Sequence, residues 1–368
     1  SLIPEIMVAY RSLAEENDII VIEGAGSPAE INLRADDIVN MGLAELVNAP
    51  VLLAGDIDRG GVFAQLYGTV ALLEKSEQQR IVGTLINKFR GDEDLLGVGL
   101  RMLEEKTGIP VLGVVPYLKV DLDDEDSLAP RLNVKRAHRP VDIAVIRLPH
   151  ISNFTDFSPL ESHEALGVRY VERTADLGEP DLIVLPGTKN TMGDLLWLRR
   201  NGLEAAITKG HIVNKTPVLG VCGGYQMLGK ELLDPDGVEG GGTLSGMGLL
   251  PCRTLFRMQK TRTRKTATAT APPFVGAALE GYEIHMGCTD TAGAAPFCRF
   301  ADGTSEGAVQ DRVFGTYLHG LFDSGELTCL LADWLLQRKG LTPCAQPQLE
   351  SHADYKERQY DLLADAVR

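Results

Sequence analysis

The amino-acid sequence predicts an α/β protein of two domains, each built around a sheet of mainly parallel strands. The length of 368 residues is enough for two domains of ordinary size. Short aliphatic runs that end in Gly, Pro or Asp alternate with amphipathic stretches, which is typical of doubly wound sheets. This alternation stops near residue 121 and resumes near residue 141, which predicts the division between the two domains.

The first domain is expected to span residues 1–120. Its expected strands are continuous runs of Val, Ile and Leu, as buried parallel strands are, at residues 19–22, 51–54, 81–87 and 111–115. Its expected helices lie between these runs, at residues 38–47, 62–73 and 94–107.

A linker is expected at residues 121–140, because an acidic stretch is followed there by a basic one that ends at Pro140. The second domain is then expected to span residues 141–368. Its clearest strands are predicted at residues 143–146, 182–185 and 218–221, and Gly-rich turns with shorter strands follow them. Residues 261–273 are rich in Thr, Ala and Pro, which predicts a loop or a hairpin tip.

The composition disfavours several classes of function. The chain has 36 Lys and Arg against 51 Asp and Glu, a net charge of −15, which argues against nucleic acid or an anionic membrane as a partner. No apolar run approaches the length that spans a bilayer. The six cysteines form no C-x-x-C pair and no zinc-like spacing, so we expect a cytoplasmic protein without disulfides or a structural metal. Nothing in the sequence indicates an oligomeric state.

The strongest chemical motif surrounds Cys222. An apolar run enters Gly220-Val-Cys222-Gly223-Gly224 and a helical pattern leaves it, which is the pattern of a nucleophile elbow with Cys in place of Ser. The start of the following helix would favour the thiolate, and the Gly223 N–H would face a developing oxyanion. The alternative is a buried structural cysteine in front of a helix.

A cysteine nucleophile needs a base, and His319 follows a short strand-like run nearly a hundred residues downstream. Taken alone, a histidine in this position is more often a structural residue, and its pairing with the Cys222 elbow is what favours the catalytic interpretation. Between the two residues, a strand ends in the turn Pro186-Gly187, and the Gly187 N–H is a second candidate donor for an oxyanion hole.

These pieces, in this order, resemble the triad glutamine amidotransferases, and further segments narrow the resemblance to the cobyric acid synthase family. Each segment is weakly specific alone, but the ordered set is specific and extends over nearly the whole chain. The matching segments are residues 22–32, 55–61, 86–92, 148–157, 281–287 and 317–323.

The resemblance implies a second domain of the class I triad glutamine amidotransferase fold, and a first domain like the P-loop-type ligases related to dethiobiotin synthetase. It implies ATP- and glutamine-dependent amidation of peripheral carboxylates of adenosylcobyrinic acid a,c-diamide, a corrinoid polycarboxylate, in cobalamin biosynthesis. ATP and Mg²⁺ are the implied cofactors. Glu23 is the implied magnesium ligand, and Asp56 and Asn87, each at or just after the end of an expected strand, are candidates for nucleotide and metal binding.

The sequence departs from the family pattern in two places. No G-x-x-x-x-G-K-[ST] motif occurs and the chain begins at Ser1, so our interpretation is that an N-terminal strand and phosphate loop have been removed. In addition, Leu321 stands where triad amidotransferases carry Glu, two residues after the histidine. Glu283 and Asp323 are both candidates for orienting His319, and a Cys–His dyad is a third possibility.

Two other functions stay open at this stage. The related cobyrinic acid a,c-diamide synthase has the same two domain types, and a non-catalytic amidotransferase-like module would keep the fold without the chemistry. A cationic stretch in this acidic chain would suit either an arm that holds the anionic substrate or a solvated hairpin tip. Its members are Arg257, Lys260, Arg262, Arg264 and Lys265.

Overall fold

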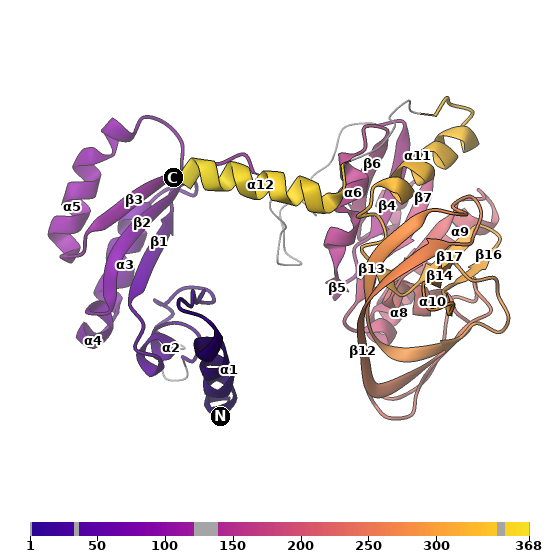
Figure 1. Cartoon of the computed structure of the whole chain (residues 1–368), viewed down its shortest axis with the longest axis horizontal. Helices are drawn as coiled ribbons and strands as arrows, with labels where there is room; N and C mark the ends of the chain where they lie inside the picture. The colour runs from indigo at the N-terminus through magenta and orange to yellow at the C-terminus, as the bar shows by residue number, and fades with distance from the viewer. Residues whose placement is uncertain (1, 33–36, 121–138, 344–349, 368) are drawn as a thin grey trace. The chain divides into compact units, whose positions relative to one another are not determined.

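The computed structural model describes residues 2–32, 37–120, 139–343 and 350–367. The chain divides into two compact units, one made of Ser1–Val120 with Tyr360–Arg368 and the other of Asp121–Gln359. Most of the expected linker at residues 121–140 lies outside the described residues. Both units are α/β (Figure 1), so the predicted fold class is confirmed.

The first unit contains a parallel sheet in the order β1-β2-β3. The strands are β1 (Val51–Asp56), β2 (Ile81–Phe89) and β3 (Val111–Pro116). Helices α3 (Val62–Leu72) and α5 (Gly97–Thr107) pack against each other and against the sheet. The remaining elements are α1 (Ile3–Glu16), α2 (Met41–Leu46), α4 (Lys75–Gln78) and the short 3₁₀ helix η2 (Glu93–Leu95). Val62 and Leu66 of α3 and Ile86 of β2 form the centre of the core.

The strand expected at residues 19–22 is wrong. These residues form neither helix nor strand, and Ile19 and Val21 are 81% and 91% exposed. An extended segment becomes a strand only when a neighbouring strand satisfies its N–H and C=O groups. In the described part of the chain β1 pairs with β2 alone, so this apolar run has no strand beside it.

The second unit is built on a six-stranded sheet in the order β16-β17-β9-β7-β4-β6. Five of its strands are parallel: β4 (Val141–Ile146), β6 (Leu166–Val171), β7 (Leu182–Leu185), β9 (Val218–Val221) and β17 (Val313–Thr316); β16 (Ala308–Gln310) runs antiparallel at one edge. The helices are α6 (Ser158–Ser162), α7 (Thr174–Leu177), α8 (Thr191–Arg200), α9 (Leu203–Ile212), α10 (Gly223–Leu228) and α11 (Glu326–Arg338), with a 3₁₀ turn η4 (Phe154–Phe157). The last helix, α12 (His352–Val367), belongs to the second unit up to Gln359 and to the first unit from Tyr360.

A second sheet of the same unit contains a long hairpin of two curved strands, β12 (Arg253–Ala269) and β13 (Ala278–Asp290) (Figure 1). It also contains β10 (Glu231–Asp234), β11 (Gly242–Ser245), β14 (Cys298–Phe300), β15 (Ser305–Glu306) and β18 (Leu318–His319). The two short strands β5 (Ile151–Ser152) and β8 (Gly187–Thr188) pair separately. The loop or hairpin tip expected at residues 261–273 is correct only after Ala269, where the chain turns between β12 and β13. Residues 261–269 continue β12 instead, and their β-branched threonines fit a strand.

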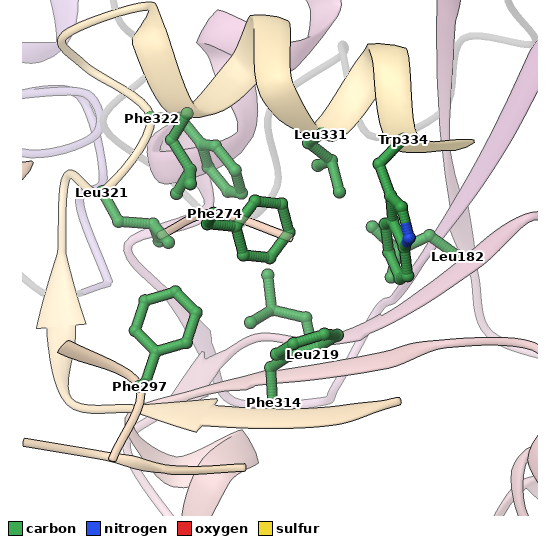
Figure 2. Close-up of a pocket in the computed structure, with 10 residues that line it drawn as sticks. Leu182, Leu219, Phe274, Phe297, Phe314, Leu321, Phe322, Leu331 and Trp334 are labelled. Atoms are coloured by element: carbon green, nitrogen blue, oxygen red, sulfur yellow. The ribbon is translucent and has the colours of Figure 1, made fainter. Parts of the chain in front are cut away.

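The apolar core of the second unit lies partly beneath α11, where aromatic side chains meet around an interior cavity of only about 10 Å³ (Figure 2). Phe274 packs within 5.5 Å of Phe314 and 5.9 Å of Trp334 between ring centroids. Leu321 points into this cluster and is 1% exposed. A leucine therefore fits the position at which triad amidotransferases carry Glu. No helix in the described ranges is long and apolar enough to cross a membrane.

Candidate active site

Cys222 occupies the sharp turn between β9 and α10. Its backbone has φ 52° and ψ −111°, a conformation that costs energy for any residue with a side chain. The turn requires glycine on both sides: a Cβ on Gly220 would lie 2.6 Å from Leu228 Cδ1, and a Cβ on Gly224 would overlap the Leu185 carbonyl. The Cys222 N–H donates to the Thr316 carbonyl at 2.8 Å, which ties the elbow to the neighbouring strand β17.

His319 ends β18 and is held by a buried carboxylate that the sequence analysis did not identify. His319 Nδ1 lies 2.6 Å from Asp156 Oδ2, and the Gly320 N–H donates to Asp156 Oδ1 at 3.1 Å. Both side chains are almost completely buried. The sequence candidates for this role were Glu283 and Asp323; Asp156, from the 3₁₀ turn η4, is the carboxylate that contacts Nδ1.

The charge state of His319 follows from this contact. Burial lowers its pKa, but the charge and hydrogen bond of Asp156, together with Cys222, outweigh burial and raise the pKa to about 10. The Nε2 atom is buried and makes no hydrogen bond within the described part of the chain. At neutral pH the ring is therefore an imidazolium, and it lies beside Cys222.

Two glycine backbones lie next to this pair. A Cβ on Gly187 would lie 3.2 Å from His319 Cε1, so the β8 backbone adjoins the imidazole ring. A Cβ on Gly223 would lie 2.6 Å from Thr188 Cγ2, so the first residue of α10 packs against the same β8 strand. Gly187, Gly223, Cys222 and His319 thus lie together in the fold.

Aromatic and amide side chains surround the cluster. Tyr282 of β13 stacks on His319 with 5.2 Å between ring centroids, and Asn153 Nδ2 donates to the Tyr282 hydroxyl at 2.5 Å. Burial raises the pKa of Tyr282 to about 12, so the phenol stays neutral. Gln226 Nε2 donates to the Tyr317 hydroxyl at 3.1 Å, one helical turn after Cys222. Asn153, Asp156 and Tyr282 all lie in segments that carried the family resemblance, and that was the only signal for them in the sequence.

The first unit brings together some of the residues expected to bind nucleotide. Asp56 and Asn87 are paired in the parallel register of β1 and β2, at the carboxyl edge of the sheet. Lys88 Nζ lies 2.8 Å from Asp56 Oδ2, and this hydrogen bond lowers the pKa of Asp56. Glu23 is exposed in a segment without helix or strand, and among the described residues no hydrogen bond or ion pair joins it to Asp56 or Asn87. No group of three or more His, Cys, Asp or Glu side chains in the described ranges could hold a metal ion.

Two protein-family models match this chain. Residues 142–327 match the family model of the CobB/CobQ-like glutamine amidotransferase domain, and residues 3–125 match that of an AAA domain, a P-loop nucleotide-binding type. A glutamine amidotransferase of known structure superposes on 54% of this chain with 17% identity and a TM-score of 0.41.

The curated relatives extend over the whole chain. A cobyric acid synthase of Ruminiclostridium cellulolyticum is 53% identical over 100% of this chain and 74% of its own length. A cobyric acid synthase of Citrobacter koseri is 51% identical over 99% of this chain and 74% of its own length. The chain therefore belongs to the cobyric acid synthase family and is a glutamine-dependent amide-forming ligase.

Proposed function

We propose that this protein amidates peripheral carboxylates of adenosylcobyrinic acid a,c-diamide, with glutamine as the source of ammonia. The observation that carries the proposal is the arrangement of Cys222, His319 and Asp156 at a nucleophile elbow. A carboxylate is a poor electrophile, so one half of the reaction must activate it. Ammonium is no nucleophile, so the other half must supply free ammonia. Glutamine hydrolysis belongs to the second unit, and carboxylate activation by phosphoryl transfer from ATP belongs to the first.

For the glutaminase half, the Cys222 thiolate adds to the side-chain amide carbon of glutamine. The oxygen that becomes negatively charged faces the N–H groups of Gly187 and Gly223. The His319 Nε2 proton passes to the amide nitrogen as the C–N bond breaks, which releases ammonia and leaves a thioester. His319 then accepts a proton from water, whose oxygen attacks the thioester to release glutamate and restore Cys222.

Asp156 has two functions in this proposal. Its carboxylate accepts a hydrogen bond from the Nδ1–H group of His319, so that Nε2 is the atom that faces the reaction. Its charge also stabilises the imidazolium, which must be protonated at the moment when ammonia departs.

For the synthetase half, Asp56 and Asn87 offer the hard oxygen ligands that Mg²⁺ prefers, and both lie where α/β sheets bind ligands. We propose that Asp56, Asn87 and Glu23 would hold Mg²⁺ jointly with the phosphate oxygens of ATP, since the described residues form no metal site of their own, and that Lys88 pairs with phosphate. Bound Mg²⁺ would neutralise phosphate charge during transfer. Because Lys88 is ion-paired with Asp56, its ammonium group lies beside the proposed metal ligands, where a nucleotide phosphate would bind.

We further propose that one face of β12 holds the anionic corrinoid. Lys260, Arg262 and Arg264 stand directly opposite Met286, Ile284 and Tyr282 of β13, so the three cations share a sheet face with the tyrosine that stacks on His319. Each is exposed and has no carboxylate partner in the described residues. A substrate with several carboxylates matches an unpaired row of cations in an otherwise acidic protein.

The experiment is to measure amide formation with glutamine and with ammonium chloride as alternative nitrogen donors. We expect Cys222→Ala to abolish the glutamine-supported reaction and to keep the ammonia-supported one. Cys288→Ala is the matched control, because Cys288 is an exposed free cysteine, and it should keep both activities. A glutamine-analogue electrophile should label wild type at Cys222 by mass spectrometry. Loss of both activities in folded Cys222→Ala, or labelling elsewhere, would contradict the assignment.

The corrinoid is tested in the same assay. Adenosylcobyrinic acid a,c-diamide should gain amide groups, whereas cobyrinic acid without the two amides should not be amidated at its a and c positions. Amidation of those two positions would instead identify the enzyme as a cobyrinic acid a,c-diamide synthase.

A further inference from the structure

A second buried carboxylate, Asp194, lies close to the proposed oxyanion donors. It belongs to the first turn of α8, and its side chain is 1% exposed. It accepts three hydrogen bonds from two segments: His150 Nδ1 at 2.7 Å, the His150 N–H at 3.2 Å and Thr188 Oγ1 at 2.5 Å. The two segments are also joined directly, because the Lys189 N–H donates to the His150 carbonyl at 3.0 Å.

Both segments lead directly to the proposed catalytic groups. His150 precedes β5 and Thr188 ends β8, and these two short strands pair through Ser152 and Gly187. Thr188 follows Gly187 in the chain, and it is also the residue whose side chain and N–H lie nearest to a Cβ built on Gly223. One buried carboxylate thus anchors the strand that touches both glycines of the proposed oxyanion hole.

The strand itself is too short to hold this geometry alone. β5 and β8 have two residues each, so their ladder supplies few hydrogen bonds. An isolated pair of such strands is unstable without further contacts. A buried carboxylate with three donors is a strong restraint, because leaving the buried Asp194 carboxylate without these hydrogen bonds costs free energy, although the His150 side chain itself is exposed.

We propose that Asp194 is a positioning residue for glutamine hydrolysis: through Thr188 and His150 it fixes the β8 backbone against Gly223, so that the Gly223 N–H stays directed at the developing oxyanion. This inference rests on the proposed role of Cys222 and His319. Asp194 itself contacts neither of them in the described structure. Its effect is therefore on stabilisation of the tetrahedral intermediate and not on the reactivity of the thiolate.

The test compares two reactions of Cys222 in the Asp194→Asn variant. Glutamine hydrolysis needs the oxyanion hole, whereas alkylation by iodoacetamide needs only the thiolate. Because the Asn amide group cannot accept from all three donors, we expect kcat for glutamine hydrolysis to fall roughly ten- to a hundredfold, with KM within about twofold of wild type. The second-order rate of alkylation should stay within about twofold of wild type.

Two further variants keep the test decisive. Thr188→Val removes one of the three donors with little change of volume. It should lower kcat as well, but by a smaller factor. This variant keeps the inference testable if Asp194→Asn folds poorly. Asp142→Asn is the control. Asp142 is ion-paired with Arg169 at 2.7 Å and lies at the amino end of β4, at the edge of the sheet opposite the elbow. This substitution should leave kcat unchanged.

The possible results separate this inference from the proposed function. An unchanged kcat in folded Asp194→Asn would overturn the positioning role, and so would an equal fall in hydrolysis and alkylation, which would indicate a general structural effect. If wild type hydrolyses no glutamine, the proposed function fails together with the inference. An active wild type with an unaffected Asp194→Asn variant would reject the inference alone.

Discussion

At the scale of single residues, the charge of His319 depends on one contact. The Asp156 carboxylate 2.6 Å from Nδ1 counteracts the effect of burial and holds the imidazolium. Without that carboxylate, burial would dominate and lower the pKa of His319. Asp156 therefore determines whether the ring beside Cys222 carries a positive charge at neutral pH.

We therefore expect Asp156→Asn to lower kcat for glutamine hydrolysis roughly a hundredfold or more, the range attributed to a positioned general acid. The alkaline limb of the pH profile of kcat should move to lower pH, because His319 loses its proton more easily without the carboxylate. Asp323→Asn is the comparison, since Asp323 was a sequence candidate for the same role, and it should reduce kcat less than about threefold. A larger loss in Asp323→Asn than in Asp156→Asn would reverse the assignment.

The residue two positions after His319 gives a second prediction. Leu321 is buried among Phe274, Phe297 and Phe322 (Figure 2), so Leu321→Glu would place a carboxylate in an apolar core without a hydrogen-bond partner. We expect the free energy of unfolding to fall by about 3 kcal/mol or more and glutaminase activity not to rise. Urea unfolding measures the first quantity. Leu321→Met, which nearly conserves volume, should cost less than about 1.5 kcal/mol.

A tenfold or larger gain in kcat for Leu321→Glu would show that the third triad position is open at Leu321, contrary to the contact with Asp156.

The sequence predicts Cys222 as a catalytic residue, but it does not predict Asp156 as the partner of His319. Cys222 is marked by glycines beside it, whereas Asp156 is separated from His319 by 163 residues and no local pattern joins them. Only the fold brings η4 to the end of β18.

At the scale of elements, β12 shows why a composition can mislead. Thr, Ala and Pro suggested a loop at residues 261–273, yet the alternation of Arg with Thr over the same residues has the period of a strand. The antiparallel partner β13 satisfies the backbone from Lys260 to Thr268, and this long-range pairing outweighs local composition. The pairing also places Lys260, Arg262 and Arg264 on one face.

We expect the triple variant Lys260→Gln, Arg262→Gln, Arg264→Gln to raise KM for the corrinoid roughly tenfold, about 1.4 kcal/mol, by removing attraction to its carboxylates. The dependence of KM on salt concentration should weaken as well. Steady-state kinetics with ammonium chloride as nitrogen donor measure this without the glutaminase step.

The matched control for this prediction removes two cations of the same strand that are already ion-paired. Arg257 lies 3.3 Å from Asp236 and Lys265 lies 3.1 Å from Asp302, so Arg257→Gln with Lys265→Gln should leave KM nearly unchanged. Equal effects of the triple variant and this control would show that only net charge matters. An unchanged KM in the triple variant would remove β12 from substrate binding.

At the scale of the whole molecule, the two units differ in how well the sequence predicts them. The strands β7 and β9, and β4 from Ile143 onward, are continuous apolar runs that are buried on both faces, and the sequence predicts all three strands to within two residues. The apolar run at residues 19–22 has the same composition, but it lies outside the described sheet. Hydrophobic pattern predicts which residues favour burial, whereas strand formation depends on whether a neighbouring strand is present.

The stability of the second unit should depend on pH through Glu306, a buried carboxyl beneath the strand that leads to His319. Burial raises its pKa from 4.5 to about 7, although the Tyr317 N–H and the Thr316 hydroxyl donate to it at 2.6 and 2.7 Å. Between these two pKa values the folded state keeps a proton that the unfolded state has lost. The contribution of this group to the free energy of unfolding therefore decreases as pH rises through that window, by at most about 1.4 kcal/mol per pH unit.

Glu306→Gln should remove this dependence, because a glutamine amide resembles the protonated acid: its oxygen can accept from the Tyr317 N–H and its NH₂ can donate to the Thr316 hydroxyl. We expect the variant and wild type to have similar unfolding free energies near pH 5, and the variant to be the more stable of the two at pH 7.5. Trp197 and Trp334, the two tryptophans of the chain, both lie in the second unit, so denaturation followed by tryptophan fluorescence measures this unit separately. A constant difference between the two proteins from pH 5 to 7.5 would show that Glu306 has the same protonation state in the folded and unfolded protein.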